Sequence, residues 1–254
     1  MTVKLMNNLI KIVAALPLLM SSLYVFSAEL SVYLPQTKQR FDYSTPMRLE
    51  RVLADIQSQA DSLAVQQFPY AMQLFDRSEA QKALQLKQQV ISELKQLGLQ
   101  EEKWQISTQL LVDQIEKWKV GQRKFIEMDY DAVRLNPAFN PMLEGEYELV
   151  APRRDNRVSI EGLVFNPSAI KLNPDYTISE YLDESMMISS SHPSYVWLIQ
   201  ADGKVLRVGY AHWNNQKQQV MPGSVIFVGF NSKADNMVKM EQAIVSLIRM
   251  RKKY

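Results

Sequence analysis

The sequence predicts an α+β protein with two small β-sheets, a pair of helices inserted in the first sheet's domain, and an amphipathic helix at the end of the chain. Apolar and polar residues alternate from Leu30 to Leu34 and from Val158 to Val164, as in strands with one buried face. Between them, residues 78–119 carry apolar side chains three and four positions apart, which is the period of a helix. A last helical pattern occupies residues 232–254.

The order of these patterns indicates an internal repeat. Two strand patterns and a helix at residues 30–56 are matched by two strand patterns and a helix at residues 158–182. Almost no residues are identical, so a chance match stays open. We expect a first domain at residues 29–152, a charged linker that begins at Pro152, and a second domain at residues 157–230.

The first 28 residues are typical of a secretory signal peptide. Two lysines precede an apolar run from Ile12 to Met20, and the small pair Ser27-Ala28 suits cleavage before Glu29. The run is shorter than the roughly 20 residues that a bilayer-spanning helix needs. We therefore expect cleavage and export, although Phe26 is bulky for its position and an uncleaved N-terminal anchor stays open.

Composition excludes several classes of function. Without residues 1–28 the chain has 27 basic and 27 acidic side chains, because the segment removes two lysines and no acid. Nucleic-acid binding normally needs a basic excess, so we expect none. The chain has no cysteine, which excludes disulfides, thiolate metal sites and cysteine nucleophiles.

The second domain contains a clear hairpin and a clear helix start. Thr177 and Glu180 are spaced as a capping box, in which each side chain satisfies the other residue's backbone N–H. Asp202-Gly203 suits a two-residue turn, which pairs Ile199 with Leu206 and Trp197 with Val208. We expect Trp197 on the core face, and the apolar stretch 224–230 as a central strand.

The C-terminal pattern predicts a helix with one apolar face and a basic end. The apolar face is formed by Met237, Met240, Ile244, Leu247 and Ile248, and the basic end by Arg249, Arg251, Lys252 and Lys253. Basic residues suit the negative end of a helix dipole without any partner. The alternative is that this helix contacts a partner protein or an anionic membrane surface.

No reactive cluster is evident. The two histidines, His192 and His212, lack a second histidine at metal-binding spacing, and no nucleophile or nucleotide motif is present. We therefore expect no enzyme activity, no cofactor and no metal. Carboxylates near each other could still act on a glycan; the candidates are Asp129, Asp131, Glu144, Glu146 and Glu148.

The segment His212-Trp213-Asn214-Asn215 combines side chains that can contact a sugar. Aromatic rings stack on sugar rings, and amide groups hydrogen-bond to hydroxyl groups. We single out Trp213 and Asn214 as candidate ligand contacts, with sheet-edge packing as the alternative for Trp213.

An ordered series of short motifs resembles the capsule biosynthesis protein GfcC family. The series runs from 32–35 (VYLP), through Arg123 followed by 131–135 (DAVRL) and 145–149 (GEYEL), to Trp213-Asn214, 222–224 (PGS) and 227–230 (FVGF). The resemblance spans the chain after the signal, more diffusely between residues 68 and 118. It implies two β-grasp domains, the second like the soluble-ligand-binding (SLBB) type, as in the outer-membrane exporter Wza.

The resemblance also implies a function and a site residue. It points to a non-enzymatic periplasmic protein of a Gram-negative bacterium that serves capsule or O-antigen-like exopolysaccharide biosynthesis and export. Its partners would be the polysaccharide or the outer-membrane export machinery. The family's arginine maps onto Arg123, although Gln122 separates it from Gly121 here, and a buried arginine bonded to carbonyl groups is the alternative. A glycan-processing or attachment enzyme that uses first-domain carboxylates, and a pure assembly adaptor, stay open as alternative functions.

Overall fold

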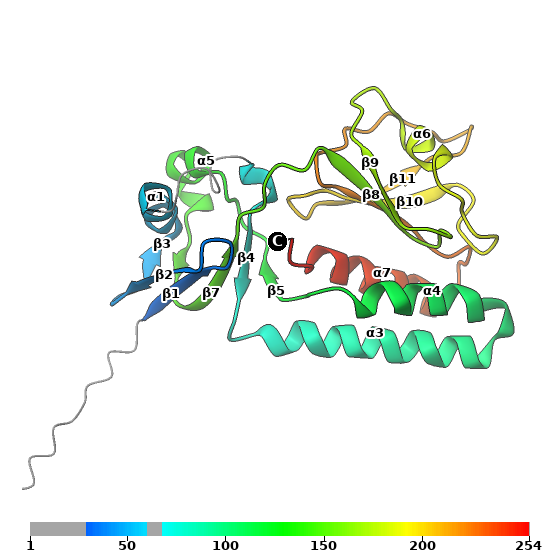
Figure 1. The fold of residues 1–254 in the computed structure, drawn as a ribbon, viewed down its shortest axis with the longest axis horizontal. Coiled ribbons are helices and arrows are strands. Elements are labelled where there is room, and N and C mark those ends of the chain that lie inside the picture. Colours follow the sequence, from blue (N-terminus) through cyan, green and yellow to red (C-terminus); the bar gives the residue numbers. More distant parts are fainter. Residues whose placement is uncertain (1–28, 60–67, 254) are drawn as a thin grey trace, which may run out of the picture.

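The computed structural model describes residues 29–59 and 68–253, and shows two β-sheets joined by long helices (Figure 1). The N-terminal sheet has the order β2-β1-β7-β4-β5, and the C-terminal sheet has the order β11-β10-β12-β8-β9. The predicted signal peptide, residues 1–28, lies outside the described residues.

The strands are short in both sheets. The N-terminal sheet contains β1 (Leu30–Leu34), β2 (Gln39–Tyr43), β4 (Gln73–Asp76), β5 (Gln122–Lys124) and β7 (Gly145–Val150). The C-terminal sheet contains β8 (Arg157–Gly162), β9 (Ser168–Lys171), β10 (Tyr195–Ile199), β11 (Val205–Gly209) and β12 (Val225–Val228). A separate two-stranded ribbon pairs β3 (Met47–Arg48) with β6 (Met142–Leu143).

Helices connect and cover these sheets. The α-helices are α1 (Leu49–Gln59), α3 (Ala80–Gln100), α4 (Gln105–Glu116), α5 (Tyr130–Leu135), α6 (Ile178–Asp183) and α7 (Asp235–Arg249), with 3₁₀ turns η1 (Pro69–Ala71), η2 (Glu102–Trp104) and η3 (Pro137–Phe139). None of the helices in residues 29–59 and 68–253 has the length and apolar character that a membrane span requires.

The two sheets have the same topology, which confirms the predicted repeat. In each, the first strand pairs antiparallel with the second and parallel with the last, and the other two strands continue on the far side. A helix, α1 or α6, follows the first hairpin in both. β12 lies in the centre of its sheet and is fully buried, as its apolar sequence predicts.

The β10–β11 hairpin is present, but its predicted register is wrong by one residue. Ile199 pairs with Val205 and Trp197 with Arg207, because the connection is a three-residue loop with Gly203 at φ 93°. Such a loop contains one residue more than a two-residue turn, and it therefore shifts the pairing of the two strands by one residue. Trp197 therefore pairs across from a charged residue, and its indole Nε1 donates to Glu241 at 2.9 Å.

Helices α3 and α4 form the predicted hairpin, and Gly98 lies within the last turn of α3. A Cβ at Gly98 would come 2.4 Å from the Thr108 hydroxyl, so glycine here allows α3 and α4 to approach closely. Trp104 and Trp118 are buried.

The hairpin leaves the N-terminal sheet but packs against the C-terminal one. It departs after β4 and returns at β5, and extends beneath the C-terminal sheet beside α7 (Figure 1). One hydrophobic cluster joins hairpin residues such as Leu94 and Leu111 to Phe227 of β12 and to α7, whereas the core of the N-terminal sheet forms a separate cluster. The Gln114 amide of α4 also bonds both backbone groups of Gly162 at 2.9 Å.

Helix α7 is amphipathic, as predicted, but its apolar face is covered by the chain itself. The five side chains singled out for a partner or membrane contact are all buried in the same cluster: Met237, Met240, Ile244, Leu247 and Ile248. Burial in the core satisfies this face, so in the described arrangement it is unavailable to a membrane or to another protein.

The shared core predicts a clear difference between two positions on α4. Leu111→Ala should reduce the free energy of unfolding by about 2–5 kcal/mol, because Leu111 is 0% exposed and the neighbours cannot fill the cavity. Ile106→Ala, on the same helix but 71% exposed, should change it by less than about 0.5 kcal/mol. Urea denaturation of a protein that comprises residues 29–254 measures both, and equal losses would contradict the shared core.

Candidate functional site

Arg123 lies where the two sheets and α7 meet. It belongs to the edge strand β5 and is 6% exposed. Its guanidinium donates to three backbone carbonyl oxygens: Met72 at 3.4 Å, Ala201 at 3.2 Å and Arg249 at 3.4 Å. Met72 directly precedes β4, Ala201 lies in the β10–β11 loop, and Arg249 is the last residue of α7. The planar fork of five N–H groups suits an arginine to this task.

The charge of Arg123 has no carboxylate partner within ion-pair distance in the described part of the chain. Burial lowers the pKa of Arg123 from its ordinary value of 12.5 to about 10, and the nearby Asp202 offsets this only in part. The guanidinium therefore stays charged at neutral pH while it is mostly desolvated, so losing its carbonyl contacts would be costly.

The basic end of the chain is also used internally. Arg251 forms a two-point ion pair with Glu161 of β8 at 2.7 and 3.0 Å, and Lys252 pairs with Glu148 of β7 at 2.6 Å. Consecutive residues thus fasten the chain end to different sheets. The Gln73 side chain adds hydrogen bonds to the backbone of Arg251 and Lys253. Two of the four basic residues at this end are therefore engaged in ion pairs within the chain.

A cavity of about 560 Å³ opens beside Arg123, and we call it the aromatic cavity. Three of its wall residues are exposed aromatic side chains: Tyr70 (51%), Phe125 (43%) and Phe139 (43%). Phe125 is held by the Arg249 guanidinium, 3.9 Å from its ring centre. Glu127 and Asp202 add carboxylates to the wall. The cavity thus combines ring faces with hydrogen-bonding groups and has the size of a small-ligand site.

The structure does not bring the three predicted ligand residues together. Arg123 lines the aromatic cavity, whereas Trp213 and Asn214 lie in the loop after β11 and do not line it. Trp213 is 77% exposed. Asn214 has a structural role, because its side chain accepts from the Ala211 N–H at 2.9 Å and donates to the Ser194 carbonyl at 3.1 Å.

The residues missed by the sequence reasoning are Tyr70 and Phe139. Each lies in a short 3₁₀ turn that begins with a proline, Pro69 or Pro137. A three-residue turn is too short to show a hydrophobic period that would identify an exposed aromatic ring. Phe125 carried a weak signal, since it lies two positions after Arg123 in an extended segment. Only the folded chain places the three rings around one opening.

The candidate catalytic carboxylates are largely occupied. Asp129 caps α5 by accepting from the Ala132 N–H at 2.9 Å, and Asp131 lies exposed beside Arg134. Glu146 contacts Arg77 at 3.7 Å, and Glu148 is committed to Lys252. Within residues 29–59 and 68–253, no three His, Asp or Glu side chains are placed to hold a metal ion.

The fold and its cavities define a mixed α/β protein with two sheets of equal topology and a ligand-sized opening at their junction. Family models agree with this class over most of the chain: the capsule biosynthesis GfcC N-terminal model matches residues 27–153, and the GfcC C-terminal model matches residues 166–252. The chain therefore belongs to the capsule biosynthesis GfcC family.

One curated relative supports this assignment. The chain is 34% identical over 119 residues to a protein of Escherichia coli (strain K12) named "Uncharacterized protein YjbG". The matched region covers 47% of this chain and 49% of the relative, so the chain spans about half the length of the relative it matches.

The junction predicts a structural penalty at Arg123. Arg123→Lys should lower the free energy of unfolding by about 1–3 kcal/mol, because one ammonium cannot reach carbonyls in three directions and leaves buried acceptors unpaired. Arg134→Lys, at an exposed position on α5, is the matched control and should be neutral. Thermal or urea unfolding measures both. Equal stability of the two variants would mean that Arg123 does not join the sheets.

Proposed function

We propose that this protein is a non-enzymatic, periplasmic polysaccharide-binding component of capsule or O-antigen-like exopolysaccharide biosynthesis and export. The observation that carries the proposal is the aromatic cavity, in which Tyr70, Phe125 and Phe139 present ring surface beside the Arg123 guanidinium. Sugar rings have apolar faces and polar edges, and a wall of this composition matches both.

The fold supports the same proposal. The shared strand order, with the first and last strands parallel in the centre, supports assignment of both sheets as β-grasp domains, the second SLBB-like and both Wza-like. We propose domain limits of 29–152 and 157–230, with residues 78–119 as the insert and the last helix at 232–254. The export machinery is the proposed protein partner.

The alternative of a glycan-processing or attachment enzyme receives less support. Asp129 is engaged as a helix cap, and Glu148 is paired with Lys252. A pure adaptor that acts through α7 would have to expose a helix face that is now part of the core.

Export is testable directly. We expect the chain to be cut before Glu29 and recovered in the periplasmic fraction, since residues 1–28 have the composition of a signal peptide. Osmotic-shock fractionation with N-terminal sequencing measures this. Recovery of a chain that starts at Met1 in the cytoplasmic fraction would contradict it.

Binding is tested by removing one ring at a time. Tyr70→Ala and Phe139→Ala should each weaken binding of oligosaccharides cut from the producing strain's capsule by about two- to tenfold, the value of a ring contact. Phe165→Ala removes a similarly exposed ring outside the aromatic cavity and is the matched control. Isothermal titration calorimetry gives the affinities, and equal affinity in all four proteins would rule out the proposed contact surface.

The cellular role follows from the same variants. A deletion strain complemented with Tyr70→Ala should carry less surface polysaccharide and accumulate polymer inside, whereas Asp129→Ala with Asp131→Ala should leave the polymer correctly attached. Polysaccharide shed into the medium by the carboxylate variant alone would favour the enzyme alternative.

A further inference from the structure

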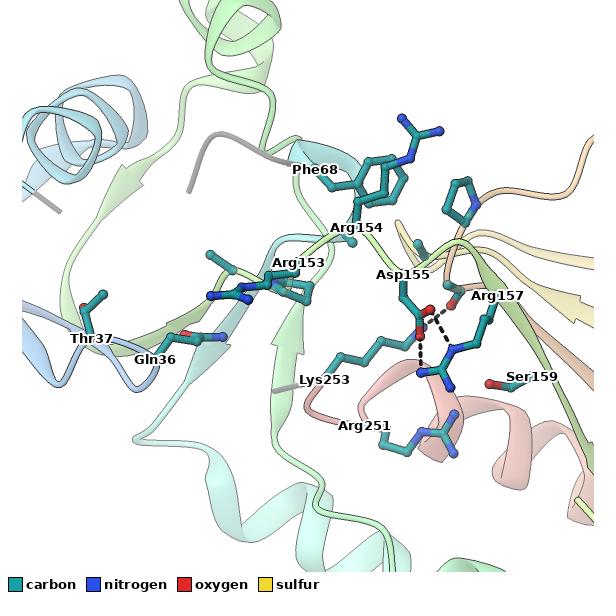
Figure 2. A pocket seen from close by; sticks show the side chains of 16 residues that line it. Gln36, Thr37, Phe68, Arg153, Arg154, Asp155, Arg157, Ser159, Arg251 and Lys253 are labelled. Atoms are coloured by element: carbon teal, nitrogen blue, oxygen red, sulfur yellow. Dashed lines mark hydrogen bonds and ion pairs between the residues drawn. The ribbon is translucent and has the colours of Figure 1, made fainter. Parts of the chain in front are cut away.

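A second and larger cavity, of about 980 Å³, is lined in part by Ala71 and Ala201, neighbours of residues that line the aromatic cavity. We call it the basic cavity (Figure 2). Its wall comes from the β1–β2 loop, the segment that joins β7 to β8, the turn before β12 and the end of the chain. It is therefore assembled from both sheets, and neither sheet alone would form it.

The wall is strongly cationic. It contains five basic side chains, Arg153, Arg154, Arg157, Arg251 and Lys253, against one acidic side chain, Asp155. Two of the five are neutralised: Arg157 donates to Asp155 at 2.8 and 2.9 Å, and Arg251 pairs with Glu161. An excess of positive charge thus remains in the cavity.

The other three cations have no carboxylate within ion-pair distance in the described part of the chain. Arg154 donates to the Asn156 amide at 3.0 Å and lies over the Phe68 ring, and Lys253 donates to the Gly223 carbonyl. Arg153 is exposed and has no partner among the described residues. Figure 2 shows it extending toward the side of the cavity where Gln36 lies.

Lys253 lies among other positive charges. Its pKa is lowered to about 8, first by burial and then by the positive charges of Arg251 and Arg123, whereas Glu161 and Asp155 raise it. Burial disfavours a charge of either sign, so it is the contribution of Arg251 and Arg123 that favours an anion here. Arginine also matches the planar oxygens of carboxylate and phosphate groups with two parallel hydrogen bonds.

We propose that the basic cavity binds an anionic group, a carboxylate or a phosphate, carried by a saccharide. That the group is anionic rests on the cavity alone. That its carrier is a saccharide rests on the proposed function and on the cavity's volume, which exceeds what a free ion needs and lies at the upper end of small-ligand sites. Nothing in the aromatic cavity is required for this contact.

The test is calorimetric titration of the full mature chain with three probes: trigalacturonate, glucose 1-phosphate and the neutral maltotriose. We expect at least one anionic probe to bind more tightly than maltotriose, and less tightly as salt is raised. Arg153→Gln should weaken that binding about tenfold, the value of a charge-assisted hydrogen bond. Arg134→Gln removes the same charge from an exposed site outside both cavities and should have no effect.

A second variant tests Lys253 separately from Arg153. Lys253→Met keeps the approximate length of the side chain and removes its charge, so it should also weaken binding of the anionic probe. The thermal unfolding temperature of this variant should be unchanged or raised. Binding by trigalacturonate alone identifies a carboxylate, and by glucose 1-phosphate alone a phosphate.

The proposal is overturned if neither anionic probe binds, or if Arg153→Gln binds as tightly as Arg134→Gln. The proposed function fails independently, through Tyr70→Ala and Phe139→Ala, because those rings line the aromatic cavity only. A protein that binds anionic probes and ignores those two changes would keep the basic cavity and lose the aromatic one.

Discussion

The arrangement of this protein depends on where the apolar face of the α3–α4 hairpin is buried. The hairpin is inserted between β4 and β5 of the N-terminal sheet. Its leucines and tryptophans are nevertheless buried in the cluster formed with the C-terminal sheet and α7. Burying this face fixes the position of one sheet relative to the other, since the hydrophobic effect here acts across the junction. The relative position of the two sheets brings the carbonyl oxygens of Met72 and Ala201 to Arg123 and forms both cavities.

Polar contacts then make the junction specific. Apolar burial alone is non-directional, whereas the Arg123 guanidinium and the two ion pairs at the chain end require particular partners at particular distances. Arg251 and Lys252 bond β8 and β7 respectively, so the last residues act as a strap between the sheets. The apolar face of α7 and the charges of Arg251 and Lys252 thus serve contacts within the chain.

The two cavities are lined by neighbouring residues of the same two segments, η1 and the β10–β11 loop, and differ in chemistry. Arg123, which lines the aromatic cavity, donates to the carbonyl oxygen of Ala201, which lines the basic cavity. On one side lie aromatic rings, and on the other an excess of positive charge. A polymer with both ring faces and acidic groups could contact both, which fits the capsule biosynthesis family to which the chain belongs.

Much of this was determined by local sequence. The capping box at Thr177 and Glu180, the central strand β12 and the repeated strand order all follow from short-range patterns and are present in the fold. The hairpin register was not, because Asp202-Gly203 permits a two- or a three-residue loop and only packing selects one. Likewise, Trp213 and Asn214 have the residue types of a ligand site, yet the fold leaves one exposed and uses the other in a turn. The sequence by itself determines which side chains have the chemistry to bind a ligand. Which of these side chains face the same cavity is decided by the tertiary structure, because the burial of α3 and α4 against the C-terminal sheet sets how the two sheets are placed.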